Sequence, residues 1–250
     1  MRRQVASEHM VRCWLPDGRC GRLGTSCPSR QCIARTVRRL LERRWRDKLG
    51  LFACEGEDLV AAATAEPLDL LVAGKNVEPR LLAALSSAAH PPRVIGVYRR
   101  GDLPAPEPRA AVLALWRVAD PGNLGTLIRT ADAFGAAIAL SEGCADPTGA
   151  KALRASAGSI WRVPLLRFEP GGEPLSPGRR VGLVSRGGAP LSELDLRGEQ
   201  VFYLGAEREG LPQAVERDCD ASIPIDGAES LNVAAAGAIA LYEWARQNRS

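Results

Sequence analysis

The sequence predicts an α/β protein with a largely parallel sheet, preceded by a second and smaller α/β unit. The first observation is the run 111–116, whose almost unbroken apolar character suits a strand buried on both faces. The second is the recurrence of short apolar runs, with helical stretches between several of them, at 137–140, 163–166, 181–185, 201–205 and 221–225. The third is a proline-rich segment that separates this series from an earlier and shorter one.

The amino-terminal half opens with residues 1–33, a basic mixture of Arg, Gly, Pro, Ser and Cys without periodicity, which predicts a poorly ordered extension. Met10 could equally be the true start. A helix is predicted over 33–49, because Val37, Leu40 and Trp45 share one side and most of the basic residues lie elsewhere. Strands and helices then alternate at 51–54, 57–64, 68–72, 79–88 and 94–98.

The segment 99–109 contains three prolines in five residues, which neither a helix nor a central strand accepts, so we interpret it as a stiff linker. The predicted organisation is an extension at 1–33, a small α/β domain at 34–98, the linker, and a larger α/β domain at 110–250.

Composition and charge limit the classes of function. No uncharged apolar run approaches the roughly 20 residues that a bilayer span requires, and the Arg-rich start lacks the apolar segment of a secretory signal. We therefore expect a soluble, cytoplasmic protein with no membrane partner. Residues 1–50 hold thirteen Arg or Lys against four Asp or Glu, whereas the other two hundred hold twenty against twenty-five. A basic end indicates a polyanionic partner, although a solvated helix face or a frayed tail would have the same charge.

The cysteines do not indicate a metal site. Four of the seven fall early in the chain, and none of them forms a close C-x-x-C pair: Cys13, Cys20, Cys27 and Cys32. We expect no metal, and we expect a cytoplasmic chain to keep its cysteines as thiols.

The first of three candidate loops runs into a helix at 120–135. Asn123 can cap this helix and Gly135 can end it. Arg129 lies off the apolar stripe, and its neighbours one turn away are Gly125 and Asp132, so it projects from a face where a missing side chain leaves space. An exposed ion pair with Asp132 is the alternative interpretation.

The second and third loops follow later strands. Gly205 and Gly210 bracket a charged turn, which indicates either a backbone approach to a ligand or a tight turn. The third loop follows a short apolar strand that includes Ile223 and Ile225, and Asn232 is placed to cap an Ala-rich helix. That helix alone would suit a core, but a polar loop between a strand's carboxyl end and a helix is where α/β proteins bind ligands.

No dinucleotide or P-loop fingerprint follows any strand. The three loops together resemble the SpoU (TrmH-type) branch of the SPOUT RNA methyltransferases. The resemblance rests on N-x-G-x-x-x-R-T-A at 123–131, L-G-A-E-x-E-G-L-P at 204–212 and I-P-I-x-G-x-x-S-L-N-V-A at 223–234. Residues 151–158 also look like the family's K-x-x-R-x-S-x-G segment, while 35–98 look, less specifically, like the ribosomal-protein-like RNA substrate-binding domain that often precedes it.

The resemblance implies a 2′-O-ribose methyltransferase that uses S-adenosylmethionine, is folded in a deep trefoil knot and acts as a homodimer. Knots are almost absent from ordinary folds, so only the family supports this expectation. Gly205, Ile223 and Leu231 would contact the cofactor mainly through loop backbone, with Ser185 nearby.

The resemblance also assigns the catalytic residues. Asn123 and Arg129 would serve the ribose hydroxyl across the dimer interface, and Glu207, Ser230 and Asn232 would complete the site. Methylation of a hydroxyl calls for a base near the nucleophile, yet both histidines lie outside these loops. A guanidinium with a pKa above 12 stays protonated, so we assign Arg129 to positioning and to stabilising the developing alkoxide rather than to proton abstraction.

The predicted function is methylation of a ribose 2′-hydroxyl in structured RNA, with no DNA partner. The added amino-terminal domain and its basic helix suit docking on a large folded RNA, which favours ribosomal RNA over transfer RNA. A tRNA methyltransferase and a non-catalytic RNA-binding or assembly factor are the alternatives. The combination of Asn123, Arg129, Glu207 and Asn232 argues against the last, because a binding protein has no need of it.

Overall fold

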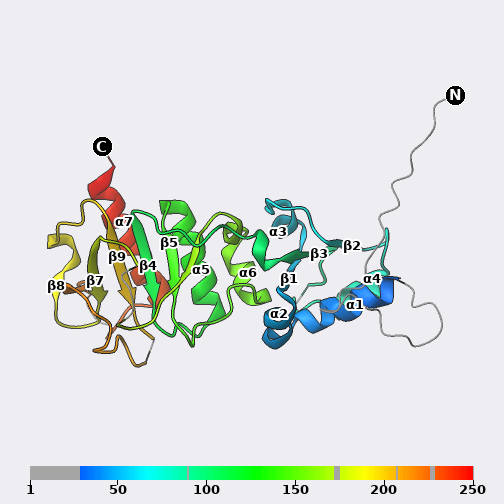
Figure 1. Cartoon of the computed structure of the whole chain (residues 1–250), viewed down its shortest axis with the longest axis horizontal. Coiled ribbons are helices and arrows are strands. Elements are labelled where there is room, and N and C mark those ends of the chain that lie inside the picture. The colour runs from blue at the N-terminus through cyan, green and yellow to red at the C-terminus, as the bar shows by residue number, and fades with distance from the viewer. Residues whose placement is uncertain (1–28, 89, 172–174, 207, 226–228, 250) are drawn as a thin grey trace.

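The computed structural model describes residues 29–88, 90–171, 175–206, 208–225 and 229–249. In this part of the chain the strands form a three-stranded antiparallel sheet and a seven-stranded parallel sheet. Figure 1 shows the smaller sheet with α1 to α4 at one end of an elongated molecule, and the larger sheet with α5 and α7 at the other. The predicted α/β class and the parallel sheet are confirmed.

The three-stranded sheet has the order β1-β3-β2. Its strands are β1 (Leu51–Glu55), β2 (Asp69–Val72) and β3 (Val94–Arg99). The helices around it are α1 (Ser29–Leu40), α2 (Arg43–Leu49), α3 (Glu57–Ala61) and α4 (Pro79–Leu85).

These elements agree with the predicted alternation, except that the single helix expected over 33–49 is wrong. The chain instead forms α1 and α2 with a break between them, and α1 begins at Ser29, inside the predicted extension. The rest of the predicted extension, with Met10 and the first three cysteines, lies outside the described residues.

The seven-stranded sheet has the order β6-β5-β4-β9-β7-β10-β8. Its strands are β4 (Ala111–Leu115), β5 (Ala137–Leu140), β6 (Leu165–Arg167), β7 (Arg179–Leu183), β8 (Ala189–Pro190), β9 (Gln200–Leu204) and β10 (Cys219–Ser222). The strand predicted at 221–225 is wrong at its end, because β10 stops at Ser222 and the two isoleucines, Ile223 and Ile225, lie outside the sheet.

Helices α5 (Pro121–Phe134) and α7 (Val233–Asn248) cover one face of this sheet, and α6 (Ala150–Ser156) packs on α5. Short 3₁₀ segments occur at Arg100–Asp102, Ser159–Trp161 and Leu191–Glu193. Gly237 of α7 lets this helix lie directly on α5, because a Cβ there would stand 2.5 Å from Leu127 Cδ2. The Ala-rich helix and α5 are therefore closely packed.

The two sheets share buried contacts. Phe52 and Tyr98 of the smaller sheet pack against Trp161, with ring centroids 5.5 and 4.9 Å from that indole. The proline-rich segment between the sheets is anchored as well, since Arg100 forms ion pairs with Asp47 and Asp146. No helix in the described part of the chain is both long enough and apolar enough to span a membrane.

Candidate active site

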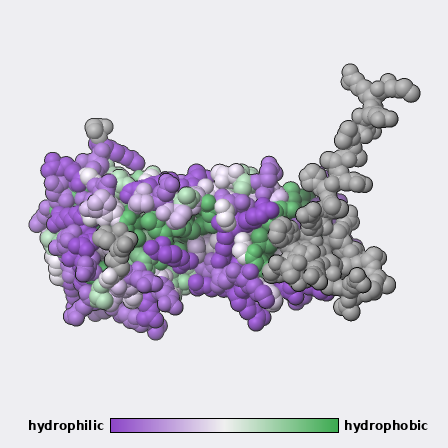
Figure 2. All heavy atoms as spheres, in the orientation of Figure 1, coloured by the Kyte–Doolittle hydropathy of each residue, from purple (hydrophilic) through white to green (hydrophobic). Residues whose placement is uncertain are grey.

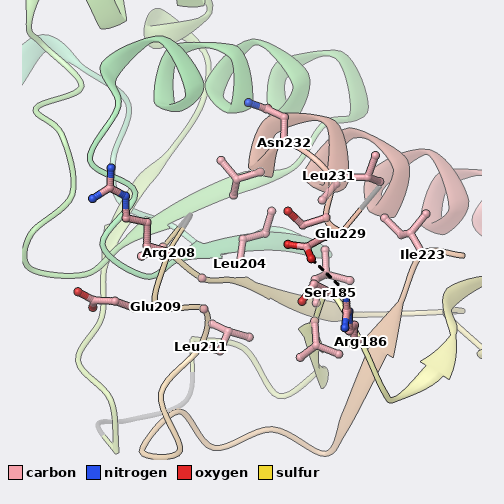
Figure 3. A pocket seen from close by; sticks show the side chains of 18 of the residues that line it. Ser185, Arg186, Leu204, Arg208, Glu209, Leu211, Ile223, Glu229, Leu231 and Asn232 are labelled. Atoms are coloured by element: carbon pink, nitrogen blue, oxygen red, sulfur yellow. Dashed lines mark ion pairs between the residues drawn. The ribbon is translucent and has the colours of Figure 1, made fainter. Parts of the chain in front are cut away.

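The carboxyl ends of the parallel strands β7 and β9 open into a pocket of about 680 Å³. Three parts of the chain surround it (Figure 3): the residues after β7, the residues after β9, and the described residues of the stretch that leads from β10 to α7, at 223–225 and 229–232. The lining combines apolar side chains such as Leu204 and Leu231 with polar ones such as Ser185. This edge of a parallel sheet is where α/β proteins bind ligands, and the volume suits a small molecule.

The loop after β9 folds back on itself. An isolated bridge joins Ala206 to Gly210, and Gly210 adopts a left-handed φ of 65°. A Cβ on Gly205 would overlap the Gly210 backbone and would lie 2.6 Å from Leu211 N. Both glycines are thus explained by the tight turn, which was one of the two predicted interpretations. This tight turn also forms one wall of the pocket, because Gly205, Gly210 and Leu211 all line the pocket.

Asn232 connects the pocket to α5. Its side-chain oxygen accepts from the backbone N–H groups of Ala234 at 2.8 Å and Ala235 at 3.4 Å, which confirms that it caps α7. Its Nδ2 donates to Asn123 Oδ1 at 3.1 Å. Two residues from predicted loops 109 positions apart therefore meet at the pocket's edge.

Asp120, rather than Asn123, caps α5. Asp120 Oδ1 accepts from the Asn123 backbone N–H at 2.9 Å, and Pro121 occupies the first helical position. The predicted cap was wrong because Asn123 already lies inside the helix, where its side chain is available to Asn232. Lys151 Nζ contacts Asp120 Oδ2 at 2.8 Å, and the hydrogen bonds from Lys151 and the Asn123 backbone lower the pKa of the Asp120 carboxyl.

Arg129 lies on the exposed side of α5 and does not line the pocket of this chain. The alternative ion pair with Asp132 is wrong, because Asp132 binds Arg162 at 2.5 Å instead. The space left by Gly125 is also occupied, since a Cβ there would meet Ala155 Cβ at 2.5 Å and Ser156 N at 3.0 Å. Gly125 therefore serves the packing of α6 on α5, and Arg129 points outward beside it.

The structure brings most of the predicted residues together. The pocket is lined by Ser185, Gly205, Ile223, Ser230, Leu231 and Asn232. Asn123 joins them through Asn232, Arg129 does not reach the pocket within one chain, and Glu207 lies outside the described residues.

The prediction missed several lining residues. They are the last residues of the strands, Leu183 and Leu204, and the charged residues at the rim, Arg186, Arg208, Glu209 and Glu229. The rule that ligands bind at strand carboxyl ends would have found the two leucines. No sequence pattern indicated the exposed ion pair between Arg186 and Glu229, whose charged atoms lie 3.7 Å apart, apart from the polar character of the two loops.

Comparisons with known proteins agree with this geometry. Residues 110–242 match the model of the SpoU rRNA methylase family. A 23S rRNA (guanosine(2553)-2′-O)-methyltransferase of Bacillus subtilis is 32% identical over 234 residues, covering 82% of this chain and 92% of that protein. An uncharacterised tRNA/rRNA methyltransferase of Mycolicibacterium smegmatis is 36% identical over 65% of this chain, but the chain spans only 53% of that protein's length.

Solved structures are similar over most of the chain. The AdoMet-bound rRNA methyltransferase of Sinorhizobium meliloti superposes with a TM-score of 0.75 and 29% identity, covering 87% of this chain and 95% of that one. The SpoU methyltransferase AviRb of Streptomyces viridochromogenes, in complex with AdoMet, gives 0.76 and 28%, covering 86% and 97%. With its three loops assembled around one pocket, the chain belongs to the SpoU rRNA methylase family.

Proposed function

We propose that this protein transfers a methyl group from S-adenosylmethionine to a ribose 2′-hydroxyl of structured RNA, with ribosomal RNA favoured over transfer RNA. The observation that carries the proposal is the hydrogen bond from Asn232 to Asn123. It joins a pocket of small-molecule size to α5, the helix that presents Arg129. The B. subtilis relative, a 23S rRNA 2′-O-methyltransferase, supports the choice of RNA.

The pocket fits the cofactor. Leu204, Ile223 and Leu231 supply apolar side chains suited to a flat heteroaromatic ring, while the turn at Gly205 and the hydroxyl of Ser185 supply polar groups. The proposed binding residues are thus those expected from the sequence: Gly205, Ile223, Leu231 and Ser185. When bound, S-adenosylmethionine supplies an electrophilic methyl group on its sulfonium.

The chain's own residues position the hydroxyl and stabilise its charge. Asn232 is held by the backbone N–H groups that it caps, and it fixes Asn123 in turn, so both amides are ordered before substrate binds. Ser230 and Glu207 complete this proposed catalytic set. Arg129 contributes a positive charge where the alkoxide develops, and the proton of the hydroxyl leaves to a substrate phosphate or to solvent.

The exposed position of Arg129 supports a homodimer. The outer side of α7 carries Ile239 and Tyr242, which are 38% and 60% exposed. Figure 2 shows hydrophobic residues gathered on the visible face of the part of the molecule that holds the larger sheet. A second copy docked there would cover this apolar surface and bring its Arg129 toward a neighbouring pocket.

We also propose a division of tasks among the parts of the chain. Residues 34–98 act as the RNA substrate-binding domain, 99–109 as a linker and 110–250 as the methyltransferase domain, working in the cytoplasm with RNA rather than DNA or membrane as partner. The family's trefoil knot is included. It is supported by α7, which follows β10 in the chain and packs on β4, β9 and α5 at the middle of the sheet.

The test is transfer of labelled methyl from S-adenosylmethionine to total RNA from a strain that lacks the protein. Wild type should yield a 2′-O-methylated nucleotide, and Arg129→Ala should be slower by about a hundredfold or more, the usual cost of losing a charge-stabilising group. Arg197→Ala is the matched control, because this exposed Arg forms an ion pair with Asp195, two residues away, and with no other residue that the structure describes.

The outcomes of this test distinguish between the candidate substrates and between an enzyme and a binding factor. Mapping the modified nucleotide decides between ribosomal and transfer RNA. A wild-type protein that binds cofactor and RNA but never transfers methyl is a non-catalytic binding factor, and the proposal is then wrong.

A further inference from the structure

The break between α1 and α2 has a specific cause. Arg46 is buried, and its Nη1 donates to the carbonyls of Leu40 at 2.7 Å and Leu41 at 3.0 Å, at the end of α1. Its Nε binds Asp146 Oδ2 at 2.7 Å, in the loop that follows β5. Because one guanidinium satisfies the last carbonyls of α1 and a buried carboxylate together, the helix ends there and α2 starts in a new direction.

The break assembles a cluster of cations around one indole. Arg39 Cζ lies 4.6 Å from the centroid of the Trp45 ring, Arg44 Cζ at 5.7 Å and Lys48 Nζ at 5.3 Å. In a continuous helix, Arg39 and Trp45 would be six residues apart and would point to different sides. We call these four residues, Arg39, Arg44, Trp45 and Lys48, the Trp45 cluster.

The cluster carries excess positive charge at the surface. Arg44 has Glu42 as a partner at 2.7 Å, whereas Arg39 and Lys48 form no ion pair among the described residues. Cation–π contacts hold the long side chains near the ring, which reduces the entropy lost when they bind a ligand. Three like charges around one ring also repel one another, so an anion placed among them gains from all three.

We propose that the Trp45 cluster is an RNA-binding surface that grips the phosphate backbone of the substrate. The inference rests on the proposed function, which makes RNA the polyanion. Phosphates bind cations regardless of sequence, and an aromatic ring beside them offers a stacking face for an unpaired base.

The contact between Arg46 and Asp146, which accompanies the break between α1 and α2, also fixes the place of the cluster relative to the pocket. Asp146 binds both Arg46 and Arg100, and Arg43 Nη1 donates to the Cys144 carbonyl at 3.1 Å. Asp146 and Cys144 lie in the loop after β5, at the edge of the parallel sheet where β7 and β9 also end. RNA held by the cluster would therefore lie on the side of the molecule that carries the methyl-transfer site.

The experiment measures binding of a fluorescein-labelled RNA stem-loop and of purified ribosomal RNA to the full chain across a series of salt concentrations. The double variant Arg39→Gln/Lys48→Gln should bind about tenfold more weakly near 0.1 M salt, with a log–log salt slope smaller by about 1.5. Trp45→Leu, which leaves the net charge unchanged, should also weaken binding severalfold because the cations lose their common support. Arg249→Gln is the control, since it removes a cation 5.8 Å from the Phe134 ring in the other part of the molecule.

The results distinguish this surface from the catalytic proposal. If wild type and both cluster variants bind RNA equally, or if Arg249→Gln weakens binding as much as they do, the cation–π contacts serve only stability and the inference is overturned. If wild type binds RNA through the cluster but transfers no methyl, the proposed reaction fails while the RNA surface stands. Cofactor affinity should be the same in all four proteins.

Discussion

At the scale of single residues, Asn232 does two things with one amide. Its oxygen accepts from the first N–H groups of α7, and its nitrogen donates to Asn123. Capping by Asn was predictable, because it depends on sequence neighbours alone. The contact with Asn123 was not, since it joins two loops that only the fold brings together.

The two tasks can be separated by substitution. Asn232→Asp keeps an acceptor for the Ala234 and Ala235 N–H groups and adds a negative charge at a helix amino end, so the free energy of unfolding should stay near wild type. It cannot donate to Asn123, whose amide would have to turn over and present its nitrogen instead of its oxygen, so the Asn123 oxygen leaves its position and methyl transfer should fall at least tenfold. Asn232→Ala loses both contacts and should in addition cost about 1 kcal/mol of stability. Denaturant unfolding and the methyl-transfer assay measure both quantities. An Asp variant with wild-type activity would show that donation from Asn232 to Asn123 is unnecessary.

The cap of α5 shows which residue-level signal was available but unused. Asp120 and Asn123 are both good capping residues, and the sequence pattern alone was interpreted in favour of Asn123. Proline is favoured at the first helical position, so the pair Asp120–Pro121 already indicated a helix start one turn earlier. The surroundings of Arg129 could not be predicted from its sequence neighbours. They depend on the ion pair between Arg162 and Asp132 and on α6, which fills the space beside Gly125.

At the scale of elements, the sequence predicted nearly every strand and helix, and its two errors have tertiary causes. Residues 33–49 have an unbroken helical pattern, but the buried Arg46–Asp146 pair ends the helix from outside. The apolar run at 221–225 has the pattern of a strand, but in the described part of the chain β8 pairs with Ala221 and Ser222 and not beyond, so the strand ends there and Ile223 and Ile225 line the pocket. The local sequence pattern reveals neither the Asp146 partner of Arg46 nor the point at which β8 stops pairing with β10.

The Arg46–Asp146 pair also gives an expected pH dependence. Burial alone would raise the pKa of Asp146, but the hydrogen bond from Thr148, the charge of Arg100 and the hydrogen bond from Arg46 outweigh it, so the pKa is lowered. A carboxylate with a lowered folded-state pKa stabilises the native state above its unfolded value, about 3.9, and loses that contribution as pH falls through the folded value.

Asp146→Asn tests this contribution. At pH 7 the variant should lose about 3 kcal/mol of stability, because both side chains of the pair are only 7% exposed and Arg46 would keep its buried charge without a charged partner. The difference between wild type and variant should be constant above about pH 5 and shrink below about pH 4. Denaturant unfolding followed by circular dichroism measures it. A difference that persists unchanged to pH 3 would mean that the pair contributes no charge-dependent stability.

The matched control is Asp195→Asn, which removes the exposed ion pair between Asp195 and Arg197. This substitution should change the free energy of unfolding by less than about 1 kcal/mol.

At the scale of the whole molecule, the strand order β6-β5-β4-β9-β7-β10-β8 places segments from distant parts of the chain around one pocket. Alternating elements predict a parallel sheet, but they do not predict that β9 inserts between β4 and β7, which brings its loop beside the residue that follows β7. The expectation that the three loops form one site came from the three motifs and not from periodicity. The same topology turns Arg129 away from the pocket of its own chain.

A heterodimer experiment decides whether Arg129 acts on the partner's pocket. Ser185 is exposed and lines the pocket, so Ser185→Trp should obstruct cofactor binding without disturbing the core, while Arg129→Ala should leave the pocket intact. Homodimers of either variant should be inactive. A heterodimer, co-expressed with two tags and purified through both, should recover about half of the wild-type rate, because the intact pocket of one protomer receives the intact Arg129 of its partner. If Arg129 serves its own chain, each protomer of the heterodimer has one defect and no activity returns. If no heterodimer can be isolated because the chain is monomeric, the shared site is excluded, and the exposed apolar side of α7 needs another explanation.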